Sequence, residues 1–292
     1  MKNKIKAPIY KLGVALSGGG ARGFAHLGAL QAMTELGLKP DIITGTSAGS
    51  LVGVFFADGY SPAEVMELFS KVKFGEFAST TIPQDGFFKT TGLQSFLKKH
   101  LRAKTFEELQ MPLRVVASDI EKGETVIISS GDIASAVVAS CTFPIVFTPV
   151  KIGGKHLVDG GLFMNLPVSI IREECEKIIG VNVSYTTTMP YSRSLKYIIE
   201  RSLHHLMASN ALADREECDY LIESEDITKF PLFELDNAQQ IYQKGYEVSS
   251  NYFEQHKKQL AHDFMQDTPI ESKGLLDALK ELAIAKVRKH VK

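Results

Sequence analysis

The sequence contains no tryptophan and only three cysteines among its 292 residues. Cys141, Cys175 and Cys218 form no Cys-x-x-Cys pair, which argues against a zinc ribbon and a thioredoxin-type motif. Their odd number argues against a disulfide framework and fits a reducing compartment. We therefore expect three buried, unreactive thiols.

The chain also lacks an excess of either charge, since 33 basic and 34 acidic residues give a formal net charge of -1. Nucleic-acid-binding proteins normally carry a basic excess, so we expect no nucleic-acid partner. No apolar run approaches the ~18 residues of a membrane span. The apolar run after the basic N-terminus, residues 12–16, is shorter than the ~7–15 residues of a signal peptide. The sequence predicts a cytoplasmic protein without an integral membrane anchor.

What the sequence does contain is an alternation of short apolar segments and helical patterns. Residues 12–17 and 41–44 are typical of buried parallel strands, and residues 22–36 and 48–57 have the spacing of helices. Ser61 and Glu64 form a capping box that starts a further helix. This order predicts an α/β fold of three layers, α/β/α, around a mostly parallel central sheet.

The remainder of the chain supplies further strands and helices. Residues 113–120 and 125–130 predict a hairpin, and Gly153-Gly154 predicts a second one. Further strands are expected at 177–183 and 219–224, and a long helix at 194–216. We expect a catalytic domain over 10–233, with residues 234–292 as a helical extension packed on it.

Two stretches allow more than one interpretation. Residues 72–109 carry Phe74, Phe77, Phe87, Phe88 and Phe96 among polar residues, which fits either a second core cluster or a lid over an acyl-chain pocket. Residues 275–292 form a basic amphipathic tail, which fits a solvated surface helix or peripheral contact with a membrane surface.

The glycine-rich loop Ser17–Gly23, SGGGARG, lies between the first predicted strand and helix. Gly18, Gly20 and Gly23 satisfy the dinucleotide pattern G-x-G-x-x-G, so an oxidoreductase is one hypothesis. However, Asp41 stands at the start of the second strand, whereas that fold requires an acidic residue at its end. A glycine-rich loop before a helix directs backbone N–H groups and the positive end of the helix dipole at a ligand, so the loop is expected to bind an anion.

The second strand ends in Gly45-Thr-Ser-Ala-Gly49, a G-x-S-x-G motif followed by an apolar helix. A serine in this context lies on a tight strand-to-helix turn, where its hydroxyl is lifted above the sheet edge. Ser47 is therefore the candidate nucleophile, and it needs a base because a serine hydroxyl alone reacts poorly.

No histidine stands where an α/β hydrolase would have its base. His204 and His205 fall within a predicted helix, and we expect all eight histidines to be surface or capped residues. The better candidate is Asp159, which closes a strand and is followed by two glycines. Its ordinary pKa of about 3.9 suits a base only where desolvation raises it. We interpret Asp119, which also ends a strand, as a hairpin or capping residue.

The segments SGGGARG, GTSAG and VDGG, in this order, resemble the motifs of patatin-like phospholipases. VVASDIEKGE, SCTFPIVFTPV and DGGLFMNLPV extend the resemblance over residues 12–168, and it continues more weakly to about residue 215. The resemblance implies a patatin-like variant of the α/β hydrolase architecture and a Ser-Asp dyad without a catalytic histidine. It implies no metal and no cofactor.

Carried over to this chain, the resemblance assigns the nucleophile to Ser47 and the base to Asp159. It places the oxyanion hole at the N–H groups of Gly18, Gly19 and Gly20, with Arg22 holding the loop or the anion. The expected activity is hydrolysis of lipid carboxylic esters through an acyl-enzyme, with a lipid or ester as substrate and transient contact with a membrane surface. The alternatives are a regulatory or scaffold protein with a vestigial site and the dinucleotide-binding oxidoreductase.

Overall fold

The structure is a computed structural model that describes residues 7–70, 79–80, 88–232 and 234–265. The predicted tail at 275–292 and the aromatic residues Phe74, Phe77 and Phe87 lie outside these ranges. The choice between a lid and a core cluster for that aromatic stretch is therefore open for these three residues.

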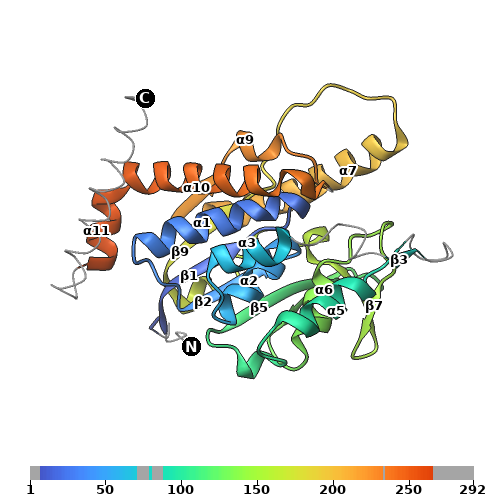
Figure 1. The fold of residues 1–292 in the computed structure, drawn as a ribbon, viewed down its shortest axis with the longest axis horizontal. Helices are drawn as coiled ribbons and strands as arrows, with labels where there is room; N and C mark the ends of the chain where they lie inside the picture. The colour runs from blue at the N-terminus through green and yellow to red at the C-terminus, as the bar shows by residue number, and fades with distance from the viewer. Residues whose placement is uncertain (1–6, 71–78, 81–87, 233, 266–292) are drawn as a thin grey trace, which may run out of the picture.

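A mixed eight-stranded sheet forms the centre of the molecule (Figure 1). Five strands run parallel in the order β10-β9-β1-β2-β5. β6 and β8 each pair antiparallel with β5, and β7 pairs antiparallel with β8. This mostly parallel sheet confirms the predicted fold class. The strands are β1 (Tyr10–Leu16), β2 (Ile42–Thr46), β5 (Leu113–Asp119), β6 (Glu124–Ile128), β7 (Val150–Ile152), β8 (Lys155–Asp159), β9 (Cys175–Asn182) and β10 (Tyr220–Glu223), with a separate pair, β3 (Ser79–Thr80) and β4 (Phe88–Lys89).

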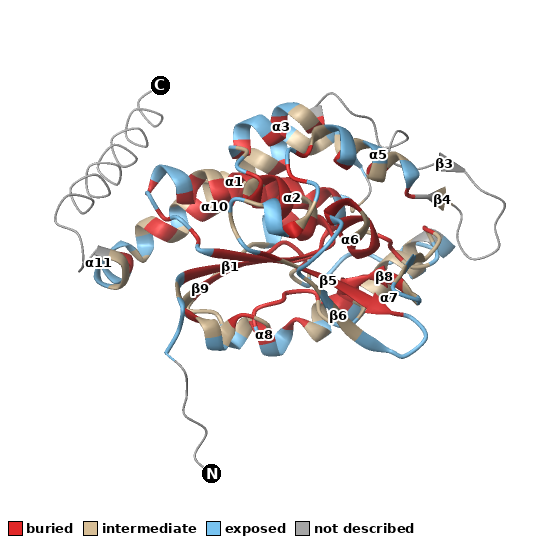
Figure 2. Cartoon of the chain, turned by 90° about the horizontal axis from the view of Figure 1, so that it is seen from below, coloured by how far each residue is buried: buried red, intermediate tan, exposed pale blue. Residues whose placement is uncertain are grey.

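Helices cover both faces of the sheet, as the three-layer prediction requires (Figure 2). With the sheet seen edge-on, α1, α2, α3 and α10 lie on one side and α8 on the other. The predicted helix at 194–216 is divided in two at Ala211. The helices are α1 (Phe24–Glu35), α2 (Ala48–Ala57), α3 (Pro62–Ser70), α5 (Thr91–His100), α6 (Ile133–Ser140), α7 (Leu195–Asn210), α8 (Leu212–Glu216), α9 (Glu225–Thr228), α10 (Ala238–Gln255) and α11 (Lys257–Met265).

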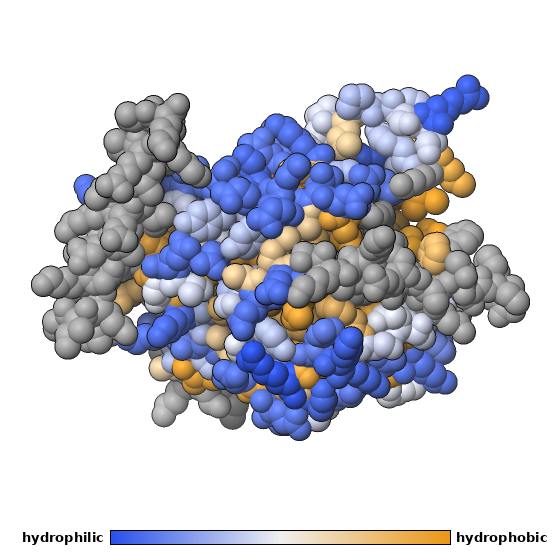
Figure 3. All heavy atoms as spheres, in the orientation of Figure 1, coloured by the Kyte–Doolittle hydropathy of each residue, from blue (hydrophilic) through white to orange (hydrophobic). Residues whose placement is uncertain are grey.

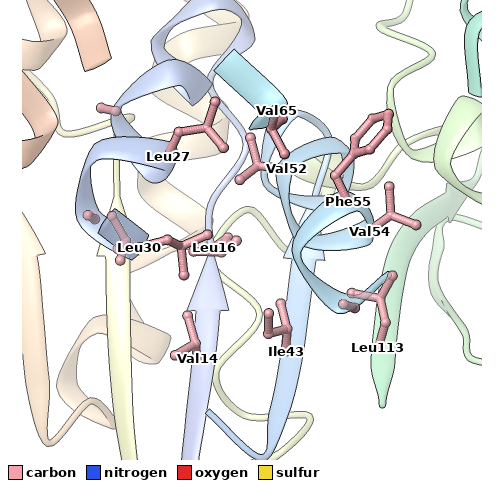
Figure 4. Packing of buried hydrophobic residues seen from close by; sticks show 14 of the residues in the cluster. Val14, Leu16, Leu27, Leu30, Ile43, Val52, Val54, Phe55, Val65 and Leu113 are labelled. Carbon is pink, nitrogen blue, oxygen red and sulfur yellow. The ribbon is translucent and has the colours of Figure 1, made fainter. Parts of the chain in front are cut away.

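The main hydrophobic core lies between the sheet and the α1–α2 side (Figure 4). Side chains from the parallel strands meet apolar residues of the two helices that follow the glycine loop and Ser47. Burying such side chains is worth about 1.5–3 kcal/mol each, so the core anchors both loops at the sheet edge. The residues labelled in Figure 4 include Val14, Leu16, Ile43, Leu113, Leu27, Leu30, Val52 and Phe55.

The helix α10 packs closely on α1. A Cβ on Gly28 would lie 2.2 Å from the carbonyl oxygen of Tyr242, and one on Gly245 would lie 2.3 Å from that of Ala25. Both glycines therefore permit a backbone approach that any side chain would block. This packing belongs to the helical layer over the sheet. The division of the chain at residue 233 stays a prediction.

The register of β5 brings two distant segments together. Thr46 of β2 pairs with Val116, and Asp159 of β8 pairs with the next residue, Ala117. β2 and β6 pair with the two different edges of β5. β8 pairs with β5 on the same edge as β2, just beyond the point where β2 ends. Since β8 runs antiparallel to β5, its last residue meets the end of β2, where Ser47 follows.

Candidate active site

Ser47 lies in a strained backbone conformation between β2 and α2. Its φ of 51° and ψ of −121° are rare for a residue with a side chain. The turn is so tight that a Cβ on Gly49 would lie 2.2 Å from the carbonyl oxygen of Leu16. The Ser47 N–H donates to Ser140 Oγ at 2.8 Å, and Ser140 Oγ donates to the Val116 carbonyl at 2.6 Å. This geometry matches the predicted nucleophile turn, with Ser140 as a support that no sequence motif indicated.

Asp159 accepts a hydrogen bond from the hydroxyl of Ser47. Ser47 Oγ donates to Asp159 Oδ2 at 2.5 Å, and the Gly161 N–H donates to Asp159 Oδ1 at 2.8 Å. The carboxyl is only 1% exposed, and this burial raises its pKa to about 6, although both hydrogen bonds act in the opposite direction. A carboxylate with such a pKa accepts a proton far better near neutral pH than an ordinary aspartate does.

The glycine loop lies beside this pair. The Gly18 N–H donates to the Asn165 carbonyl at 3.0 Å, so this predicted oxyanion donor is already engaged. Gly19 and Gly20 line the same pocket as Ser47 and Asp159, and within the described chain their N–H groups have no hydrogen-bond partner. Of the three glycines predicted to form the oxyanion hole, Gly19 and Gly20 are therefore the two whose N–H groups are unengaged in the described chain.

The backbone of Gly20 has a special requirement. Its φ is +56°, and a Cβ there would lie 2.2 Å from the carbonyl oxygen of Leu232. The Ala21 N–H donates to that same carbonyl at 2.7 Å. The glycine loop is thus held against the segment before residue 233 by a hydrogen bond from Ala21 and by a close approach that only glycine permits at position 20.

The side chain of Arg22 ties the glycine loop to segments far along the chain. Its Nε donates to the Phe230 carbonyl at 2.8 Å, and its Nη1 lies 3.3 Å from His204 Nε2. Burial, together with the like charge of Arg201, lowers the pKa of Arg22 to about 10. Of the two roles predicted for Arg22, these contacts support holding the loop, because the side chain does not line the pocket.

The expectation that the histidines are surface or capped residues is wrong for two of them. His204 is 3% exposed and lines the pocket, and His26 is fully buried with Nε2 at 2.8 Å from the Ser17 carbonyl. Burial is the main cause that lowers the pKa of each to about 4, so both are neutral at pH 7. Neither contacts Ser47 Oγ, whose one partner in the described chain is Asp159.

Asp119 has the predicted structural role. Its Oδ1 accepts the N–H groups of Glu121 and Lys122 at 3.0 and 3.2 Å, inside the β5–β6 hairpin. This competing carboxylate therefore caps a turn and does not contact the nucleophile.

A mostly apolar pocket, about 1150 Å³ in volume when the open solvent at its mouth is included, lies over the Ser47–Asp159 pair. Phe96 packs on Phe55 and Phe69 in the core, and Phe88 packs on Phe147, which lines the pocket. The predicted aromatic stretch thus contributes to both the core and the pocket. The apolar lining includes Phe24, Leu27, Leu51, Val52, Phe69, Leu93, Phe143, Phe147 and Met207.

Two negative findings concern the part of the chain that the structure describes. It contains no group of three or more His, Cys, Asp or Glu residues placed to hold a metal ion. None of its helices has the length and apolar character needed to cross a membrane.

The molecule is thus a three-layer α/β protein in which a strained serine and a buried carboxylate meet at the end of a mostly parallel sheet. A model of the patatin-like phospholipase family matches residues 14–171, more than half of the chain. The chain belongs to the patatin-like phospholipase family.

Several curated proteins are similar to this chain. An uncharacterized NTE family protein of Mycobacterium tuberculosis is 32% identical over 178 residues, covering 60% of this chain and 30% of that protein. The uncharacterized protein YqhO of Bacillus subtilis is 29% identical over 202 residues, covering 58% and 69%. Patatin-like phospholipase domain-containing protein 7 of Rattus norvegicus is 30% identical over 178 residues, covering 58% and 13%. The chain thus spans less than a third of the mycobacterial and rat proteins.

Among solved structures, VipD from Legionella pneumophila aligns with a TM-score of 0.48 at 16% identity, covering 96% of this chain and 85% of that one. A complex of SpcU and ExoU from Pseudomonas aeruginosa aligns with a TM-score of 0.42 at 16% identity, covering 86% and 53%.

Proposed function

We propose that this protein is a serine acyl hydrolase that cleaves lipid carboxylic esters. The observation that carries the proposal is the 2.5 Å hydrogen bond from Ser47 Oγ to the buried carboxylate of Asp159. Membership of the patatin-like phospholipase family supports it. The apolar pocket over the pair supports an acyl chain as the part of the substrate that binds.

In the first half-reaction, Ser47 Oγ attacks the ester carbonyl carbon while its proton passes to Asp159 Oδ2. The carbonyl oxygen becomes an oxyanion, which the N–H groups of Gly19 and Gly20 stabilise. One such donor is typically worth about 100- to 1000-fold in rate. When the tetrahedral intermediate collapses, the bond to the alcohol breaks and Asp159 returns its proton to the leaving oxygen. An acyl group then remains on Ser47.

In the second half-reaction, Asp159 takes a proton from water, and the water oxygen attacks the acyl carbon. Collapse of this intermediate releases the carboxylic acid, and the proton on Asp159 returns to Ser47 Oγ. The cycle restores both side chains, and the two atoms between which the proton moves, Ser47 Oγ and Asp159 Oδ2, already lie in hydrogen-bond contact. The raised pKa of Asp159 suits both of its proton transfers.

A fluorophosphonate probe tests the nucleophile directly. We expect covalent labelling of the wild type and none of Ser47→Ala. The companion variant Asp159→Asn should lose turnover on a panel of lipid and short-chain esters, and Asp119→Asn is its matched control at a buried carboxylate outside the pair. A folded wild type that neither labels nor hydrolyses any ester would refute the proposal.

The alternatives make different predictions. A regulatory or scaffold protein with a vestigial site would fold normally and remain unlabelled. A dinucleotide-binding oxidoreductase would show a thermal shift with a nicotinamide cofactor. However, Gly19 and Gly20 line the same pocket as Ser47, the proposed nucleophile. Binding of a pyrophosphate requires no nucleophile, so this arrangement favours the hydrolase. The cytoplasmic location remains a prediction.

A further inference from the structure

The outer side of α7, the segment before it and the start of α8 carry an unusual share of exposed hydrophobic side chains. Of the eleven large hydrophobic residues exposed in the described chain, six lie between positions 189 and 212. Tyr191 and Leu195 are the most exposed, at 74% and 76%. Figure 3 shows hydrophobic residues reaching the surface where α7 begins. A grouped apolar surface, unlike a single exposed leucine, indicates an interaction site. The six residues are Met189, Tyr191, Leu195, Ile198, Leu206 and Leu212.

Three of these residues form a stripe along one face of α7. Leu195, Ile198 and Leu206 fall within a narrow arc at 100° per residue, and all three are exposed. His204 and Met207, on the inward side of the same helix, line the pocket over Ser47. An α-helix is about 10 Å wide with its side chains, so only the width of α7 separates the exposed stripe from the pocket.

A polar surface pocket flanks the stripe, and we call it the Arg201 notch. Arg201 Nη2 donates to the Thr187 carbonyl at 2.9 Å and lies 3.0 Å from His205 Nε2. No carboxylate in the described chain forms an ion pair with this guanidinium. The notch thus combines hydroxyl donors with an unpaired cation, which is a set of groups that suits a phosphate. Its lining residues are Thr186, Thr187, Thr188, Met189, Tyr197, Arg201 and His205.

Basic residues outnumber acidic residues in this region. Residues 185–210 contain the basic residues Arg193, Lys196 and Arg201 and the single acidic residue Glu200. An apolar stripe beside basic and hydroxyl groups is typical of a helix that lies in the interface of a lipid layer, about 5–10 Å deep. Anionic lipids supply both the apolar phase and the negative phosphates that these two features match.

We propose that α7 is the surface by which this protein docks on an anionic lipid layer. The stripe enters the acyl region, and the Arg201 notch receives a lipid phosphate. Docking would place the pocket one helix width from the lipid, so that an acyl chain leaves the layer with little exposure to water. This inference rests on the proposed acyl hydrolase function, because only a lipid substrate requires the pocket to lie at a lipid surface.

The test is flotation of the full chain with vesicles of phosphatidylcholine, with and without phosphatidylglycerol. We expect binding that is stronger with phosphatidylglycerol and weakened by salt. The double variant L195S/I198S should bind about tenfold more weakly, because it removes two apolar side chains from the interface. The control I120S/I127S removes two exposed isoleucines, each about as exposed as Ile198, from the β5–β6 hairpin and should bind as the wild type does. Arg201→Gln should bind the two vesicle types about equally.

Turnover separates this inference from the proposed function. L195S/I198S should hydrolyse a soluble short-chain ester at the wild-type rate and a vesicle-borne ester about tenfold more slowly. Equal vesicle binding by wild type and L195S/I198S would overturn the docking surface, even if both hydrolyse the soluble ester. A wild-type dimer that L195S/I198S converts to a monomer, with vesicle binding unchanged, would overturn it in favour of a second copy of the chain. Vesicle binding that depends on the stripe, in a protein inactive on every ester, would refute the proposed function alone.

Discussion

Replacing Asp159 by asparagine should stabilise the folded protein while it abolishes turnover. Asparagine has nearly the shape of aspartate, so its Oδ1 can still accept the Gly161 N–H, and its amide can donate to Ser47 Oγ in place of the present bond. What the substitution removes is a negative charge at a position that is 1% exposed. In the proposed reaction that charge accepts the serine proton, and in the folded protein it opposes folding.

The magnitude follows from the pKa of Asp159. Burial raises it from 3.8 to about 6, so the folded protein binds this proton more tightly than the unfolded chain does. Its contribution to stability is therefore fully present below about pH 4 and is lost as pH rises through about 6. At about 1.4 kcal/mol per pKa unit, ionised Asp159 costs the fold about 3 kcal/mol above that range. We expect Asp159→Asn to recover about 1–3 kcal/mol at about pH 8 and almost nothing at about pH 4.

Urea unfolding of wild type and Asp159→Asn at a series of pH values measures this difference. Asp226→Asn is a control of opposite sign, because the ion pair with Lys229 lowers the pKa of Asp226 and its removal should not stabilise the protein. The reasoning is refuted if Asp159→Asn is no more stable than wild type at about pH 8. It is equally refuted if the gain in stability does not change with pH.

Three further predictions concern the reaction and the packing around it. On a soluble ester, kcat/KM should fall about tenfold per pH unit below about pH 6, because protonated Asp159 cannot act as the base; a profile flat down to about pH 4 contradicts this. His204→Gln should keep turnover within about tenfold of wild type with the same acid limb, and a loss as complete as that of Ser47→Ala would show that the base is misassigned. Gly28→Ala should lower the free energy of unfolding by about 1–3 kcal/mol, since its Cβ would meet the α10 backbone, whereas a Cβ on Gly53 would lie 3.1 Å from its nearest neighbour, a side-chain atom, and Gly53→Ala should cost less in the same urea titration.

The sequence by itself determined most strands of the sheet and several helices, and it singled out Ser47 as the candidate nucleophile. Strands and helices follow from the local spacing of apolar residues, and the glycines around Ser47 indicate a turn that only small residues permit. The two hairpins were also predictable, because Gly153-Gly154 and the 121–124 turn are local signals. The motif order identified the family before any geometry was known.

Only the tertiary structure decided which groups meet. Ser47 and Asp159 are 112 positions apart, and their contact depends on the register of β5, which holds the ends of β2 and β8 side by side. Ser140 supports Ser47 from a third segment, and no local pattern announces it.

The engagement of the Gly18 N–H by Asn165 and the burial of His204 likewise arise from segments far apart in the chain. The pKa of Asp159 is the clearest case, since its cause is burial. Burial is a property of everything packed around a side chain, so the sequence could name Asp159 as a candidate base, and only the assembled fold gives it the raised pKa which that role requires.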